Sequence, residues 1–170
     1  MIRTAEKRDI DQICDIYNYY VQHSIATFDE KEMSGPEMEE YLSGIMNNYP
    51  WLVYESVGEV LGYAYVSPWK SRSAYKYSLE STIYIHPDYI RKGIGTRLYS
   101  VLISRAKELG FHALIGGISL PNPASVALHE KMGFQKIGQF CEVGFKFDKW
   151  VDVGYWELLL KEKPQIHIRK

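Results

Sequence analysis

The feature that most constrains the fold is one junction, in which a strand candidate leads through a glycine-containing turn into a helix candidate. The strand candidate, Tyr77–Ile85, is rich in β-branched and aromatic residues and ends at His86–Asp88. Gly93 and Gly95 follow, and apolar residues then recur at helical spacing as far as Leu109. The junction therefore predicts a strand and a helix that meet where several backbone N–H groups are free.

The same junction is a candidate anion site. Glycines allow the backbone to approach a ligand closely, and the first N–H groups of a helix face an anion such as phosphate. Arg91 and Lys92 would add positive charge at the rim. On the glycines alone, a plain tight turn is the more common explanation. The spacing matches neither the phosphate loop that ends in Gly-Lys-Ser/Thr nor the dinucleotide fingerprint, so ATP and NAD are disfavoured.

The rest of the chain alternates helix and strand candidates without a repeat or an interdomain linker. Asp9 can cap a helix through Tyr20, and Ser34-Gly-Pro begins a second helix. The runs around Gly58-Glu59 predict an antiparallel hairpin. The other expected segments are strands at 2–5, 112–118, 134–147 and 151–160 and a helix at 122–132.

Composition excludes several classes of partner. The chain carries 20 Lys and Arg against 21 Asp and Glu, so it has no broad basic field to attract nucleic acid or anionic lipid. No apolar run approaches the ~20 residues needed to cross a bilayer. Cys14 and Cys141 lie far apart without metal-ligand spacing, and the chain opens with charged residues instead of a signal core. We expect one cytoplasmic domain over residues 1–170, with a core of 1–162 and a tail of 163–170, and no metal, nucleic-acid or membrane partner.

The junction resembles the pyrophosphate loop of the GCN5-related N-acetyltransferase superfamily (GNAT), Gln/Arg-x-x-Gly-x-Gly/Ala. Here the loop reads Ile-Arg-Lys-Gly-Ile-Gly over residues 90–95. Ile90 replaces the usual Gln or Arg, which removes one side-chain contact and leaves the backbone amides unaffected. A second superfamily element, Asn-x-x-Ser-x-x-Leu-Tyr-x-x-x-Gly-Phe, is matched by residues 122–134 with His129 in place of Tyr. In that superfamily the Asn and Ser contact the pantetheine arm of CoA, which implies this role for Asn122 and Ser125.

Three longer stretches, 62–75, 80–85 and 143–156, resemble the phosphinothricin and methionine sulfoximine acetyltransferases within that superfamily. His129 is itself typical of this group. The resemblance implies a single α/β domain of the GNAT fold, with a mixed, mostly antiparallel sheet flanked by helices, whose central strands splay after Ile83 to admit CoA. It also implies direct transfer of an acetyl group from acetyl-CoA to the free amine of a small amino-acid analogue. A homodimer is expected, with residues 145–156 as a candidate interface.

The resemblance implies roles for individual residues as well. Acetyl transfer needs a neutral amine, so a base must take a proton from an ammonium group. Glu80 is the expected base, directly or through water, and His129 is expected to protonate the leaving thiolate. Each has a simpler explanation, because Glu80 could pair with Lys70 or Arg72, and a helical His is more often a surface or capping residue. The expected CoA-binding residues are Ile83, Tyr84, Ile85, Arg91, Lys92, Gly93, Ile94, Gly95, Thr96, Asn122 and Ser125.

The expected acceptor site follows the turn at Trp69. Lys70 and Arg72 could hold a carboxylate or phosphinate, since the planar fork of Arg suits either anion, although ordinary solvated loop charges are the alternative. The full expected set is Lys70, Ser71, Arg72, Glu80, Ser81 and Thr82. Two other functions stay open. An acetyltransferase for protein N-termini, lysines or polyamines would need an open groove and, for cationic substrates, an acidic patch. A noncatalytic acyl-CoA sensor would bind CoA without turnover.

Overall fold

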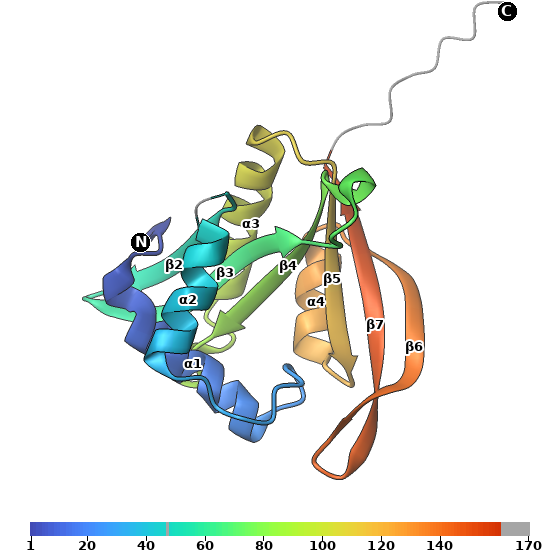
Figure 1. Ribbon diagram of the computed structural model, residues 1–170, viewed down its shortest axis with the longest axis horizontal. Helices are drawn as coiled ribbons and strands as arrows, with labels where there is room; N and C mark the ends of the chain where they lie inside the picture. The colour runs from blue at the N-terminus through green and yellow to red at the C-terminus, as the bar shows by residue number, and fades with distance from the viewer. Residues whose placement is uncertain (47, 161–170) are drawn as a thin grey trace, which may run out of the picture.

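The computed structural model describes residues 1–46 and 48–160, so the expected tail at 163–170 lies outside the described residues (Figure 1). Three short 3-10 helices, Lys7–Asp9, Ser73–Tyr75 and Pro87–Tyr89, lie between the longer elements. The strands and helices are β1 (Ile2–Thr4), α1 (Ile10–His23), α2 (Gly35–Met46), β2 (Trp51–Ser56), β3 (Glu59–Pro68), β4 (Ser78–Ile85), α3 (Ile94–Glu108), β5 (Ala113–Leu120), α4 (Pro123–Lys131), β6 (Gln135–Lys146) and β7 (Lys149–Leu159).

The seven strands form one sheet in the order β1-β2-β3-β4-β5-β7-β6. Only β4 and β5 pair in parallel, which confirms the expectation of a mixed, mostly antiparallel sheet. Helices α1 and α2 cover one face, while α3 and α4 lie on the other (Figure 1). Side chains alternate across a strand, so Trp51 and Val53 pack with α1 and α2, whereas Leu52 packs with α3. Coverage of both faces explains why β2 and β3 are apolar almost throughout.

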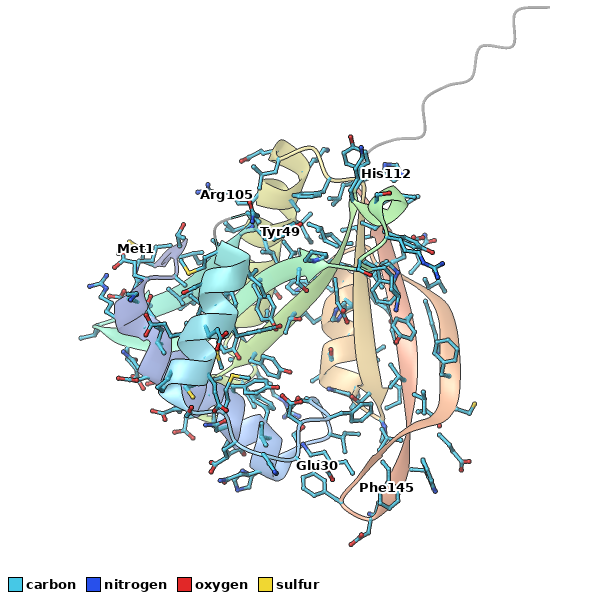
Figure 2. The ribbon with its side chains drawn as sticks, in the orientation of Figure 1. Met1, Glu30, Tyr49, Arg105, His112 and Phe145 are labelled. Atoms are coloured by element: carbon cyan, nitrogen blue, oxygen red, sulfur yellow. The ribbon has the colours of Figure 1, made fainter. Side chains whose placement is uncertain are left out.

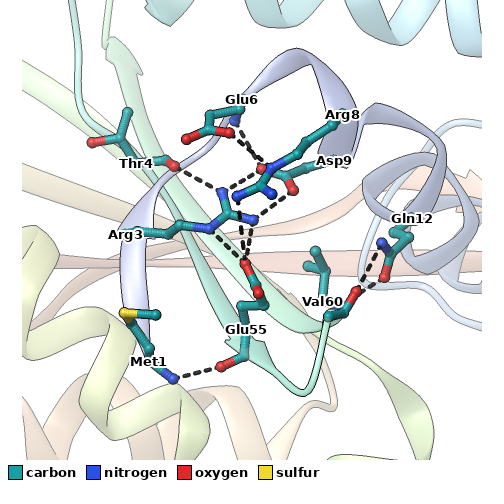
Figure 3. A network of polar contacts seen from close by, with 10 residues as sticks. Met1, Arg3, Thr4, Glu6, Arg8, Asp9, Gln12, Glu55 and Val60 are labelled. Carbon is teal, nitrogen blue, oxygen red and sulfur yellow. Dashed lines mark hydrogen bonds and ion pairs between the residues drawn. The ribbon is translucent and has the colours of Figure 1, made fainter.

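The expected elements are present, with boundaries shifted by a few residues. Helix α1 runs three residues beyond Tyr20, to His23. Val57 and Gly58 form the β2–β3 turn, and both have positive φ (51° and 80°), as a type I′ turn requires. Asp9 occupies the N-cap position of α1, but its side chain bonds elsewhere. Its carboxylate accepts hydrogen bonds from Arg3 at 2.6 and 2.7 Å, and Arg3 also donates to Glu55 at 2.6 Å, which ties β1 to β2 (Figure 3).

The two central strands separate earlier than expected. Strands β4 and β5 pair only between Ser78–Glu80 and Ala113–Ile115, so the splay begins after Glu80, three residues before Ile83. Beyond that point β4 remains paired with β3, and β5 remains paired with β7. The separation coincides with Gly116 on β5, against which His129 of α4 packs. No helix within the described ranges is long and apolar enough to cross a membrane.

Candidate active site

The anion-binding end of the site is the turn before α3. Gly93 is the N-cap and lies in the left-handed region (φ 77°), a conformation that other residues adopt only with strain. Gly95 serves a different purpose, because a Cβ there would lie 3.2 Å from Leu128 Cδ2, so the glycine allows α4 to approach α3 closely. The first amides of α3, from Ile94 to Thr96, have no partner within the helix. With Arg91 exposed beside them, they suit a phosphate group.

Beyond Glu80 and Ile115, a gap separates β4 from β5. The β4 edge of this gap presents backbone groups from alternate residues. The β3–β4 ladder is bounded by hydrogen bonds from Trp69 N to Ser78 O (3.2 Å) and from His86 N to Leu61 O (2.9 Å). In an antiparallel pair every second residue bonds to its partner strand, so Tyr84 turns its N–H toward β3. Residues 81, 83 and 85 turn their N–H groups toward the gap. Of the three expected residues 83–85, the amides of the two isoleucines therefore face the gap.

The β5 edge is arranged in the same way. Leu160 N donates to His112 O at 2.8 Å, so the even-numbered residues of β5 bond to β7, while Gly117 and Ser119 face the gap. Ser81 Oγ spans the closed end of the gap and donates to Ile115 O at 3.4 Å. Two strand edges with free N–H and C=O groups fit an extended chain of amide groups. This is the chemistry of a pantetheine arm, and the phosphate-binding turn lies at one end of the gap.

Glu80 lies where the two strands separate. Its side chain is half-buried, and burial raises the pKa of its carboxyl group, while the nearby charge of Lys70 lowers that pKa in part. A Cβ on Gly117 would lie 3.6 Å from Glu80 Oε1 and 3.4 Å from the Tyr155 ring. These are ordinary contact distances, so Gly117 leaves open space beside the Glu80 carboxyl group that a methyl group could also occupy. A carboxylate that binds a proton more readily than usual suits a general base.

His129 lies on the opposite face of β5 and is only 3 % exposed. Its Nε2 would be 2.5 Å from a Cβ on Gly116, so that glycine is required for the ring to fit. Nδ1 lies 2.8 Å from Ser125 O, and Nε2 lies 2.9 Å from the Tyr99 hydroxyl. Burial lowers the pKa of His129, partly offset by the bond to Ser125. The ring is therefore buried and neutral near pH 7, which differs from the expected proton donor.

The expected anion-binding residues lie on the surface. Lys70, Ser71 and Arg72 are exposed, and Lys70 Nζ stands 4.6 Å from the centroid of the Trp69 ring. The Trp69 ring in turn contacts Tyr155, whose hydroxyl has a pKa raised by burial and by Glu80. These contacts place Lys70 on the Glu80 side of the gap.

Ser81 and Asn122 have structural contacts of their own. The Ser81 side chain is buried on the α3 face, away from Glu80, and the Tyr99 hydroxyl lies 3.1 Å from its Oγ. Asn122 caps α4 by accepting a hydrogen bond from Ser125 N at 3.1 Å. Beyond the contact of its hydroxyl with Ile115 O at the closed end, Ser81 therefore faces the gap with its backbone groups.

The loop between α1 and α2 contacts the β6–β7 hairpin. Lys146, whose side chain is buried, donates from Nζ to Ser24 O (2.9 Å) and Thr27 O (2.8 Å). The Phe28 ring occupies the space above Gly144, where a Cβ would lie 2.3 Å from it. Figure 2 shows Glu30 of this loop and Phe145 of the hairpin at the same end of the structure.

Sequence reasoning missed four residues that shape the site. Gly116 and Gly117 admit His129 and Glu80 on opposite faces of β5, Tyr99 bonds to His129, and Tyr155 packs beside Glu80. The adjacent glycines inside a strand were a usable signal, because glycine in a strand often marks a close approach of other groups. Tyr99 gave no such signal, since an aromatic residue in a helix is usually part of the core. Among the described residues, no three His, Cys, Asp or Glu side chains are grouped so as to hold a metal ion.

Taken together, a helix start with free amides, a gap edged with further free amides and a half-buried carboxylate match what an N-acetyltransferase of the GNAT type requires. The model of the acetyltransferase (GNAT) domain family matches residues 2–154, and the chain belongs to that family. This membership confirms the predictions of the fold and of an acetyl-CoA-dependent N-acetyltransferase.

Relatives with known names match over most of their length. The chain is 38% identical over 156 residues to the phosphinothricin N-acetyltransferase of Streptomyces viridochromogenes, covering 92% of this chain and 85% of that protein. It is 36% identical over 162 residues to an L-methionine sulfoximine/L-methionine sulfone acetyltransferase of Salmonella typhimurium, covering 95% of each. A structure described as an acetyltransferase of Salmonella typhimurium with its cofactor acetyl-CoA superposes with a TM-score of 0.93 at 35% identity, covering 96% of this chain and 95% of that one.

Proposed function

We propose that this protein acetylates the free amine of a small amino-acid analogue of the phosphinothricin, methionine sulfoximine or methionine sulfone type. The observation that carries the proposal is the position of Glu80, a half-buried carboxylate of raised pKa where β4 and β5 separate. Relatives that cover most of this chain are named for such substrates. When bound, acetyl-CoA would supply an activated thioester, and no metal is needed for the transfer.

The proposed donor site uses backbone groups more than side chains. The amides of residues 93–96 and the charges of Arg91 and Lys92 would hold the pyrophosphate. The N–H groups of Ile83 and Ile85 would bond the pantetheine arm and the thioester carbonyl, with Asn122 and Ser125 contributing from α4. The Tyr84 amide, which turns toward β3, would contribute through the strand pairing that keeps its neighbours in place.

The proposed acceptor site lies on the face of Glu80. Lys70, Ser71 and Arg72 would hold the acidic group of the substrate. Ser81 would contribute backbone contacts, and Thr82, whose backbone pairs with β3, would contribute its side chain on the face of Glu80. Glu80 would take the proton of the ammonium group, directly or through water. Direct transfer is supported by Cys141, because within residues 1–46 and 48–160 no hydrogen bond from a basic side chain reaches its exposed thiol to activate it. A separate cavity of about 280 Å³ lies on the same face of the sheet, and none of these acceptor residues lines it. Its walls are Tyr17, Asp29, Met33, Met38, Tyr41, Trp51, Tyr63 and Tyr65.

We also propose a homodimer in the cytoplasm, with resistance to a herbicide or antibiotic as one biological outcome. Exposed apolar side chains gather on the β6–β7 hairpin, where Phe140, Phe145 and Trp150 are 60%, 50% and 64% exposed. Exposed apolar surface of this kind is typical of an interface. The two cysteines are unpaired, which fits a reducing compartment.

A substrate panel tests the proposal. Thiol release from acetyl-CoA is measured with phosphinothricin, methionine sulfoximine, methionine sulfone, ordinary amino acids, polyamines and an N-terminal peptide. Selective turnover of the first three is the expected result. Turnover of only a polyamine or a peptide would move the protein to the second class of acetyltransferase. Tight binding of CoA without turnover of any amine would indicate a sensor.

A further inference from the structure

Tyr99 joins His129 to β4 in a buried chain of hydrogen bonds. Its hydroxyl lies 2.9 Å from His129 Nε2 and 3.1 Å from Ser81 Oγ, and Ser81 Oγ lies 3.4 Å from Ile115 O. The side chains of Ser81, Tyr99 and His129 are all buried. The chain of contacts therefore runs from α4 through α3 to the point where β4 and β5 separate.

The tautomer of His129 follows from what each ring nitrogen faces. Nδ1 lies 2.8 Å from Ser125 O, and a carbonyl oxygen can only accept, so Nδ1 carries a hydrogen. Burial lowers the pKa of the ring, so it carries one hydrogen near pH 7. Nε2 is then without a hydrogen and accepts one from the Tyr99 hydroxyl.

The Tyr99 hydroxyl has two acceptors within reach, His129 Nε2 at 2.9 Å and Ser81 Oγ at 3.1 Å, so its single hydrogen is shared between them. The hydroxyl of Ser81 in turn donates to Ile115 O. Burial raises the pKa of Tyr99, so the phenol keeps its hydrogen. Glu80, on the other face of β4, also raises that pKa. Among the described residues, Tyr99 is the titratable side chain in contact with the ring of His129.

We infer that Tyr99 is a positioning residue for acetyl transfer, because its hydroxyl holds His129 in the Nδ1–H tautomer with Nε2 as an acceptor. In the resting enzyme His129 then has no ring hydrogen free for a leaving thiolate. Its influence on the gap passes through the hydroxyls of Tyr99 and Ser81. The role of Tyr99 in acetyl transfer rests on the proposed function. The tautomer of His129 does not, because it can be measured without any substrate.

The first test is ¹⁵N NMR of the histidine rings in the unmodified protein. His129, assigned by comparison with His129→Gln, is expected to show a protonated Nδ1 and an unprotonated Nε2 near neutral pH, and to titrate at lower pH than an ordinary histidine. In Tyr99→Phe the neutral form loses a hydrogen bond, so the pKa of His129 rises and titration moves to higher pH. A hydrogen on Nε2 in the unmodified protein would overturn the inference.

The second test is kinetic. Tyr99→Phe should lower kcat by roughly tenfold or more, with KM for acetyl-CoA unchanged, although less than the ~10⁴ lost when a serine-protease histidine takes the wrong tautomer. Tyr54→Phe is the matched control, because it removes a hydroxyl that bonds Arg97 of the same helix at 3.0 Å. Equal kcat and an unchanged pH profile in Tyr99→Phe would refute the positioning role. If the unmodified protein acetylates no amine, the proposed function fails, while the NMR result still decides the link between Tyr99 and His129.

Discussion

The two faces of β5, at Gly116 and at Gly117, place ionisable side chains in different environments. Glu80, beside Gly117, is half-buried and feels the charge of Lys70. His129, beside Gly116, is buried and bonded at both ring nitrogens. Burial moves both groups toward their neutral forms, which raises the pKa of the acid and lowers that of the histidine. We call the face at Gly117 the open face and the face at Gly116 the closed face. A group on the open face can exchange protons with substrate or water, whereas a group on the closed face is held in place.

The largest effect should come from the open face. Glu80→Gln keeps the shape and removes the base, so kcat/KM at pH 7 should fall by roughly 10²–10⁴-fold with acetyl-CoA binding unchanged. Steady-state thiol release and calorimetric titration with CoA measure the two quantities. The control is Glu157→Gln, a half-buried strand carboxylate on β7. Undiminished turnover in Glu80→Gln would show that the carboxylate is not the base.

The pH dependence follows from the same residue. A raised pKa means that Glu80 binds a proton at a higher pH than an ordinary carboxyl group does. A base must be unprotonated, so kcat/KM should be full above that pKa and decline as the pH falls through it. The acid limb should be absent from the residual activity of Glu80→Gln. A limb that persists in this variant would belong to another group.

The next largest effect should come from Arg72, one of the residues proposed to bind the acidic group of the substrate. Arg72→Ala should raise KM for an acidic acceptor by roughly 10–100-fold, the loss of a hydrogen bond between charged groups. The kcat should change little, since in the proposed site Arg72 contacts the acidic group of the substrate and not its amine. Lys149→Ala, an exposed cation on the hairpin, is the control. Equal KM values for the two variants would leave Arg72 as an ordinary solvated charge.

The two glycines allow the faces to be compared directly. Gly116→Ala would place a methyl group 2.5 Å from His129 Nε2, so we expect a loss of about 1–3 kcal/mol in stability. Gly117→Ala meets its neighbours at 3.4 Å or more and should leave stability nearly unchanged. Chemical denaturation measures both. Equal stability losses would mean that the closed face is no more tightly packed than the open one.

The sequence predicted the elements and the glycine turn before α3 well because both depend on local patterns. Glycines 93 and 95, the run at 77–85 and the cap at Asn122 act through their immediate neighbours in the chain. The splay was misplaced and Tyr99 was missed because both depend on how α4 packs onto β5. Tyr99 and His129, which bond to each other, are 30 apart in the sequence, and no local pattern records their contact. Glu80 was expected as the base through the family resemblance, and the rarity of an unpaired charge in an apolar strand supported that expectation.

The smallest expected effect concerns stability in acid. His129 has a lowered pKa in the folded protein, so the unfolded chain binds the proton more readily. The resulting stability is fully present above the unfolded pKa of about 6.5 and is lost as the pH falls toward the folded pKa. Thermal unfolding of the unmodified protein and of His129→Gln, followed from about pH 7.5 to 5, measures this difference. The unmodified protein should lose more stability on acidification, because Gln has no proton to bind. Parallel curves would show that the face of β5 at Gly116 is open to water and protons, as the face at Gly117 is.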